Sequence, residues 1–182
     1  MKALLPLAVA LLTACAATHP SGEKSAPPTA QHAWLHQLVG EWEVTSETVM
    51  EPGAEPIVWT SHDSVRSLGG LWVLIEGAME SEEQSFHTRM TLGYDPDLGT
   101  FVGSYVDSMQ TQLWTYTGTL DEAARVLTLE ATGPAMHDPT QTGRYRDQIE
   151  LVSPDEKRMV SSAVDADGNW FTFMEMVGRR VD

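Results

Sequence analysis

Ten short segments rich in β-branched and aromatic residues, joined by brief links, constrain the fold of this chain more than any other feature of its sequence. Nearly every link carries turn-forming residues, such as Pro52-Gly53 and Gly69-Gly70. Parallel strands would need long crossover connections, and these links are too short for them. We therefore predict antiparallel strands at 41–49, 57–67, 71–79, 85–94, 100–108, 112–120, 125–131, 143–152, 157–164 and 169–178.

An all-β, up-and-down antiparallel barrel of about ten strands is the fold that this succession favours, with a β-sandwich as the main alternative. Upstream of the strands, Trp34, Leu35 and Leu38 recur at helical spacing within 31–39, and Gly40 follows as a stop. We expect this short helix to close one end of the barrel. A closed sheet of more than about eight strands has room for a ligand beside its core side chains.

The first residues have the pattern of an export signal. Lys2 precedes an apolar run at 3–12, and small residues lead into Cys15. This pattern resembles a bacterial lipoprotein signal, in which residues 1–14 are removed and the cysteine carries lipid; an ordinary secretory peptide with an incidental cysteine is the alternative. Because Ala16 rather than aspartate follows the cysteine, the resemblance implies a lipid-anchored protein of the bacterial cell envelope, on the outer membrane and facing the periplasm.

The remaining chain divides into a tether and one domain. Residues 15–30 are rich in Ala, Ser, Pro and Thr, which indicates a flexible tether, and residues 31–182 have the length of a single domain. Cys15 is the only cysteine, so this domain has no disulfide. Removal of Lys2 with the signal leaves 10 basic and 26 acidic residues, a formal charge of −16. Such a charge repels phosphate backbones and argues against nucleic-acid binding.

Short motifs along the domain resemble two related groups of proteins. Gly40 and Trp42 are similar to the Gly-x-Trp motif that begins the first strand of lipocalins and their calycin relatives, and we expect Trp42 to close the barrel end near the helix. The order and spacing of further motifs resemble the family catalogued as domain of unknown function 1579 (DUF1579). Those motifs are Leu68-Gly69-Gly70, Leu92-Gly93-Tyr94-Asp95, Tyr105-x-Asp107-Ser108-Met109, Asp138-Pro139 with Thr142-Gly143, and Met174-Glu175-Met176. The resemblance implies a lipocalin-like barrel and no settled activity.

A carboxylate between an aromatic ring and a thioether marks the centre of the chain. Within residues 90–120 the pattern predicts three strands joined by two short turns. Tyr105, Asp107 and Met109 then share one side of the middle strand, because side chains alternate faces along a strand. A buried carboxylate without a partner costs several kcal/mol or becomes protonated, so we expect an arginine such as Arg146 nearby.

We predict a cavity in which arginine and carboxylate groups orient the polar end of a ligand while aromatic and methionine side chains hold its apolar part. Asp147 and Glu175 also lie between apolar neighbours in their strands. The candidate ligand-binding residues are Tyr105, Asp107, Met109, Trp114, Tyr116, Arg146, Met174 and Glu175. Two alternatives stay open: these faces point outward, or the charged pairs are internal salt bridges without a ligand.

Three functions are compatible with these patterns. The favoured one is a membrane-anchored module that binds a small, partly apolar molecule, with the loop 133–142 as a lid or mouth loop. The second is an enzyme with Asp107 or Glu175 as general base and Arg146 as electrostatic clamp. The third is a structural envelope lipoprotein with a filled barrel. Neither a Gly-x-Ser-x-Gly motif nor a free cysteine nucleophile supports the enzyme.

The sequence predicts neither a metal site nor a cofactor. His32 and His36 lie four residues apart on the expected helix, but no third ligand accompanies them. Haem-binding barrels of the nitrobindin type, which this fold resembles, use a histidine near the final strand, and residues 169–182 contain none. The expected partners are therefore an unidentified small molecule and the membrane that would hold the lipid at Cys15.

Overall fold

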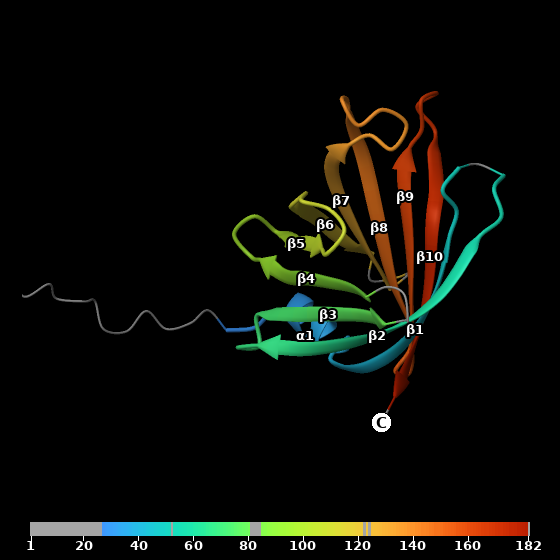
Figure 1. The fold of residues 1–182 in the computed structure, drawn as a ribbon. Coiled ribbons are helices and arrows are strands. Elements are labelled where there is room, and N and C mark those ends of the chain that lie inside the picture. Colours follow the sequence, from blue (N-terminus) through green and yellow to red (C-terminus); the bar gives the residue numbers. More distant parts are fainter. Residues whose placement is uncertain (1–26, 52, 81–84, 122, 124, 182) are drawn as a thin grey trace, which may run out of the picture.

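The computed structural model describes residues 27–51, 53–80, 85–121, 123 and 125–181. The predicted signal peptide, the predicted lipid attachment site at Cys15 and most of the predicted tether lie outside these residues. In the described part, one short helix precedes ten strands (Figure 1). These elements are α1 (Ala30–His36), β1 (Gly40–Thr48), β2 (Ile57–Leu68), β3 (Trp72–Glu80), β4 (Ser85–Asp95), β5 (Thr100–Asp107), β6 (Trp114–Asp121), β7 (Val126–Pro134), β8 (Thr142–Ser153), β9 (Glu156–Val164) and β10 (Trp170–Val181).

The ten strands form one closed antiparallel barrel. Each strand pairs with its neighbours in the chain, and β1 closes the ring by pairing with β10. The closing ladder runs from Glu41 opposite Val181 to Thr48 opposite Met174. The predicted up-and-down barrel is confirmed, and the sandwich alternative is wrong. The antiparallel order was predictable because short links join consecutive strands as hairpins, whereas parallel pairing needs long crossover connections.

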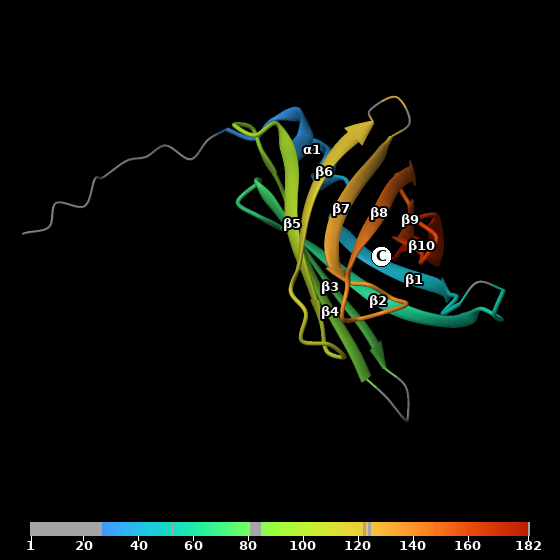
Figure 2. The same cartoon turned by 90° about the horizontal axis from the view of Figure 1, so that it is seen from above.

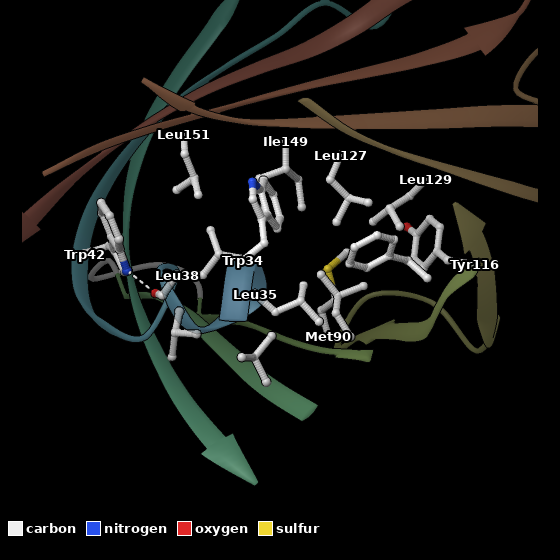
Figure 3. Packing of buried hydrophobic residues seen from close by; sticks show 14 of the residues in the cluster. Trp34, Leu35, Leu38, Trp42, Met90, Tyr116, Leu127, Leu129, Ile149 and Leu151 are labelled. Atoms are coloured by element: carbon white, nitrogen blue, oxygen red, sulfur yellow. Dashed lines mark hydrogen bonds between the residues drawn. The ribbon is translucent and has the colours of Figure 1, made fainter. Parts of the chain in front are cut away.

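The helix closes one end of the barrel, as predicted (Figure 2). Its side chains Trp34, Leu35 and Leu38 are buried among the aliphatic residues of the strands (Figure 3). Trp42 is 0% exposed, and its indole N–H donates a hydrogen bond to the Leu38 carbonyl at 2.8 Å. Full burial of one such aliphatic side chain contributes about 1.5–3 kcal/mol. This end therefore contains a dense apolar core.

Arg180 fastens the helix to the barrel wall. Its guanidinium donates hydrogen bonds to the carbonyls of Val39 at 2.6 Å and Gln37 at 3.0 Å, which follow the last turn of α1. Gly40 makes this approach possible, since a Cβ there would lie 2.1 Å from the Arg180 Nη1 atom and the backbone φ is +139°. Only glycine adopts that conformation without strain.

The opposite end of the barrel carries the hairpin connections β1–β2, β5–β6, β7–β8 and β9–β10. The predicted long loop 133–142 is shorter in the structure, because Gly133 pairs with Gly143 and Pro134 with Thr142 as part of the β7–β8 ladder. Only residues 135–141 remain in the loop, and Ala135 within it is buried. We call this end the open end, since inward-facing side chains of its strands, such as Trp114, remain partly exposed.

Candidate functional site

Four polar side chains meet inside the barrel, beyond the apolar core. The phenol O–H of Tyr116 on β6 donates a hydrogen bond to Asp147 Oδ2 on β8 at 2.7 Å, and each residue is only 8% exposed. Ser161 on β9 pairs with Asp147 in register and is 2% exposed. Tyr105 on β5 lies close enough for the Asp147 carboxylate to affect its titration. We call Tyr105, Tyr116, Asp147 and Ser161 the inner polar cluster.

Strand alternation explains why these residues face inward. Asp147 lies two residues from Ile149, and Tyr116 two residues from Gly118, on the buried face of each strand. Along β8 the burial alternates regularly, so Asp147 must project with the core residues rather than with Arg146. The barrel thus forces a carboxyl group into its interior.

Burial dominates the electrostatics of the inner polar cluster. It raises the pKa of Asp147, while hydrogen bonds from Ser161 and Tyr116 act in the opposite direction. Burial also raises the pKa of Tyr105 and of Tyr116, and neighbouring carboxylates add to both shifts. Among the described residues, Asp147 has no salt-bridge partner within 4.0 Å. Its carboxyl group therefore has hydrogen-bond donors but no compensating positive charge.

Replacing Asp147 tests this account through pH. A carboxyl whose pKa is higher in the folded protein binds a proton more readily when folded, so the free energy of unfolding falls as the pH rises. The cost of ionising Asp147 is absent below its ordinary pKa of 3.8, grows above that value and levels off above the raised pKa of the folded state. We expect the stability of Asp147→Asn relative to wild type to increase with pH above about pH 4, measured from denaturant midpoints. A difference that stays constant with pH would contradict the raised pKa.

Aromatic rings line the interior between the inner polar cluster and the open end. Trp114 and Tyr145, the next inward residues from Tyr116 and Asp147, have ring centroids 4.7 Å apart in an edge-to-face contact. Phe173 follows, with its ring centroid 6.3 Å from that of Tyr145. The Trp114 ring lies against Gly133, where a Cβ would come within 2.4 Å of it. We call Trp114, Tyr145 and Phe173 the mouth rings.

Among the described residues, three buried donors inside the barrel have no hydrogen-bond partner: the indole Nε1 atoms of Trp34 and Trp114, and the hydroxyl of Ser46. Trp34 lies in the apolar core under the helix, whereas Ser46 is 0% exposed on the same face of β1 as Trp42. An unpaired buried donor costs about 1–3 kcal/mol. Natural proteins rarely keep such groups without a water, ion or ligand to satisfy them.

A second charged group inside the barrel is an ion pair. Lys157 Nζ on β9 lies 2.9 Å from Asp63 Oδ2 on β2, and these side chains are 13% and 15% exposed. The lysine stem crosses Gly178, where a Cβ would lie 2.7 Å from its Cε atom. The Lys157 ammonium lies 5.0 Å from the centroid of the Trp42 ring. The Lys157 ammonium is thus paired with Asp63 and lies near the Trp42 ring at the closed end.

Half of the predicted site residues face the interior. Tyr105, Trp114 and Tyr116 lie on the inward faces of β5 and β6, next to the core. Met174 on β10 pairs with Ser161 and Thr48. The structure therefore brings these four predicted residues to one interior surface; their role in binding stays a prediction.

Met109 departs from the predicted arrangement, whereas Asp107 stays beside Tyr105 as predicted but ends its strand in a turn. Strand β5 ends at Asp107, whose Oδ1 accepts the backbone N–H groups of Met109 at 2.8 Å and Gln110 at 3.1 Å. The carboxylate therefore organises the turn after the strand, as aspartates often do. Met109 lies beyond the strand and is 75% exposed, so it does not share an inward face with Tyr105.

Arg146 and Glu175 lie on the outer wall, so the predicted pair of Arg146 with Asp107 is wrong. Arg146 precedes the inward Asp147, and its guanidinium lies 4.4 Å from the centroid of the Trp170 ring. Glu175 is exposed, since a register shift between Thr172 and Met174 breaks the simple alternation of β10. A β-bulge of this kind moves following side chains to the other face. The base and the clamp of the enzyme hypothesis therefore do not meet.

The site prediction missed Asp147, Ser161 and the Asp63–Lys157 pair. The sequence marked Asp147 as a carboxylate between apolar neighbours, but the predicted site included Arg146. Adjacent residues of a strand point to opposite faces, so only one of the two can face the interior. Asp63 alternates with the buried Val65, which is the signal that could have marked it. Its pairing with Lys157, 94 residues away, leaves no local signal.

Other candidate sites find less support. An open depression of about 370 Å³ lies at the wall of β1, β2 and β3, lined by Glu43, His62 and Met79 among others. It contains none of the buried polar atoms that lack a partner. His32 accepts the backbone N–H of Thr29 at 2.9 Å and so serves the start of α1.

Within the described ranges, no group of three or more His, Cys, Asp or Glu side chains could hold a metal ion. In the same part of the chain, no helix combines the length and the apolar character needed to cross a membrane.

Sequence comparison places the domain in a family. Residues 27–180 match the sequence model of the family described as "Protein of unknown function (DUF1579)". The chain belongs to this family. The resemblance predicted from the short motifs is confirmed, and no curated protein matches the sequence at a significant level.

The barrel of this DUF1579 member is similar to solved structures. The crystal structure of Rv2717c from M. tuberculosis matches with a TM-score of 0.56 and 13% identity, covering 86% of this chain and 100% of that one. The S-type phycobiliprotein lyase CPES from Guillardia theta matches with a TM-score of 0.58 and 11% identity, covering 85% and 94%. At such low identity the likeness concerns the fold alone.

Proposed function

We propose that this chain is a lipid-anchored binding protein of the bacterial cell envelope that holds a small, partly apolar molecule inside its barrel. The observation that carries the proposal is the change in lining along the interior. Apolar residues such as Trp34, Leu35 and Trp42 dominate the closed end, where the charged pair, Asp63 with Lys157, is internally matched. The inner polar cluster and the mouth rings line the part toward the open end. Binding sites of this kind combine an apolar wall with a few placed polar groups.

Two of the unpartnered donors, those away from the helix, support the same conclusion. Trp114 Nε1 and the Ser46 hydroxyl are buried without a partner, and a ligand acceptor would satisfy either. The similar barrel of a phycobiliprotein lyase is compatible with a binding role. A purely structural lipoprotein would instead be expected to fill its interior with side chains that need no outside partner.

A native mass spectrum of the purified protein tests the binding. We expect a retained small molecule, which is lost or reduced in Trp114→Ala because that change removes part of the mouth. Trp72→Ala is the matched control, since it removes the same type of ring at a position that is 38% exposed. A wild-type spectrum without added mass, together with no uptake of small apolar probes, would favour the structural lipoprotein.

The envelope location has a separate test at Cys15. If this residue carries the lipid, Cys15→Ser should leave the protein unprocessed or release it from membrane fractions. Immunoblots of membrane and soluble fractions give the distribution. A variant that stays membrane-bound and is processed like wild type would show that the lipoprotein interpretation is wrong, without affecting the binding proposal.

A further inference from the structure

We infer that the interior site selects a ligand whose polar end is a protonated amine, recognised by the Asp147 carboxylate together with Tyr116 and Ser161. This inference rests on the proposed binding function and adds the chemical class of the ligand. It starts from a buried carboxyl group that has hydrogen-bond donors but no cationic partner. Within the described chain, Asp147 is more than nine-tenths buried and has no cation in salt-bridge range.

The hydrogen bonds around Asp147 suit an ionised carboxylate. Tyr116 donates to Oδ2 at 2.7 Å, and the Ser161 hydroxyl acts on the same carboxyl group. Donors of this kind favour the charged form, whereas burial alone opposes it. The group thus has the environment of an acceptor for a further donor, and what it lacks is positive charge. An ammonium supplies both a donor and that charge.

In the part of the chain that the structure describes, each cation that faces the barrel interior already has a partner. Lys157 is committed to Asp63 at 2.9 Å. Arg146, although adjacent in sequence, faces outward and lies over the Trp170 ring. Within the described residues, the other charges that affect the inner polar cluster are carboxylates, those of Asp63 and Asp107 at Tyr105. A ligand carboxylate would meet like charge here, so fatty acids fit this site poorly.

The surrounding rings suit a cationic ligand end. Tyr105 and Tyr116 lie beside Asp147, and Trp114 and Tyr145 occupy the next inward positions toward the open end. Aromatic rings attract an ammonium group through their quadrupoles. Four methionines face the interior from β4, β9 and β10 and offer adaptable contacts to an apolar chain: Met90, Met159, Met174 and Met176. The buried Ser46 hydroxyl has no hydrogen-bond partner in the protein, which independently supports a ligand in the interior.

Three probes with the same apolar chain and different ends test the inference: octylamine, octan-1-ol and octanoate. Calorimetric titration of the wild-type protein at pH 7 should give octylamine a Kd at least about tenfold lower than octan-1-ol, with octanoate weakest. Asp147→Asn should raise the octylamine Kd to that of octan-1-ol while leaving octan-1-ol binding unchanged. Retained octan-1-ol binding also shows that the variant is folded.

A control variant separates a site from general attraction to an acidic protein. Glu175→Gln removes an exposed carboxylate from the outer wall of the same barrel and should leave the preference for octylamine intact. Equal affinity for the three probes, tight octanoate binding, or loss of the preference in Glu175→Gln would overturn the inference while the binding function stands. Failure of all three probes to bind would count against the binding function itself.

Discussion

Trp42→Ala should lower the free energy of unfolding by about 3 to 5 kcal/mol, the usual cost of emptying a buried aromatic site. The Trp42 ring is 0% exposed and contacts two cations, with Arg180 4.2 Å and Lys157 5.0 Å from its centroid. Its N–H also holds the Leu38 carbonyl at the end of the helix segment. One substitution therefore removes core area, two cation–π contacts and the link between barrel and helix.

The melting temperature should fall by roughly 6 to 20 °C for a domain of this size. Trp42→Phe separates the contributions, since it keeps most of the apolar ring but loses the hydrogen bond; we expect an intermediate loss. Leu98→Ala, at a turn residue that is 72% exposed, is the surface control and should change stability by no more than about 0.5 kcal/mol. A melting curve of Trp42→Ala that overlays wild type would refute the closed-end core described above.

Lys157→Met should cost about 3 kcal/mol, the lower end of the range for breaking a buried ion pair. The lower end applies because Lys157 and Asp63 retain 13% and 15% exposure. Methionine keeps a chain of similar length over Gly178, so the loss reports mainly on the charge that Asp63 is left with. Denaturant unfolding of the purified protein measures it.

The double variant Asp63→Asn/Lys157→Met should recover most of this loss, because neither charge is then left alone. Arg89→Met is the control for an exposed pair: Arg89 and Glu76 form a salt bridge on the outer wall with 64% and 38% exposure, and its loss should cost no more than about 1 kcal/mol. If Lys157→Met and Arg89→Met were equally mild, the interior pair would be solvated rather than buried.

Local chemistry explains why the strands were predictable. Each strand predicted from β-branched and aromatic residues is present, with boundaries within three residues of the observed ones. The turns follow residues that prefer them, such as Gly69, Gly70 and Gly99 at positive φ. Trp42 at the closed end was predictable from the resemblance of Gly40 and Trp42 to the Gly-x-Trp motif that begins the first strand of lipocalins.

The site was predicted less well, because strand ends and bulges change which groups a side chain contacts. Asp107 accepts backbone N–H groups in a turn, as Asp95 and Asp165 do at the ends of their own strands. That repeated pattern was visible in the sequence. Glu175 was different, since the irregular register near Phe173 cannot be read from the alternation of residue types.

Strand and turn positions, the antiparallel order and the helix that covers one end depend on residues close together in the chain, so the sequence predicts them. Which face of each strand points inward depends on the assembled sheet, since both faces are partly apolar and one bulge reverses the alternation. Closure of the barrel then brings Asp63 to Lys157 across 94 residues and Tyr116 to Asp147 across 31. Such contacts depend on the register of the whole sheet, which no single segment specifies.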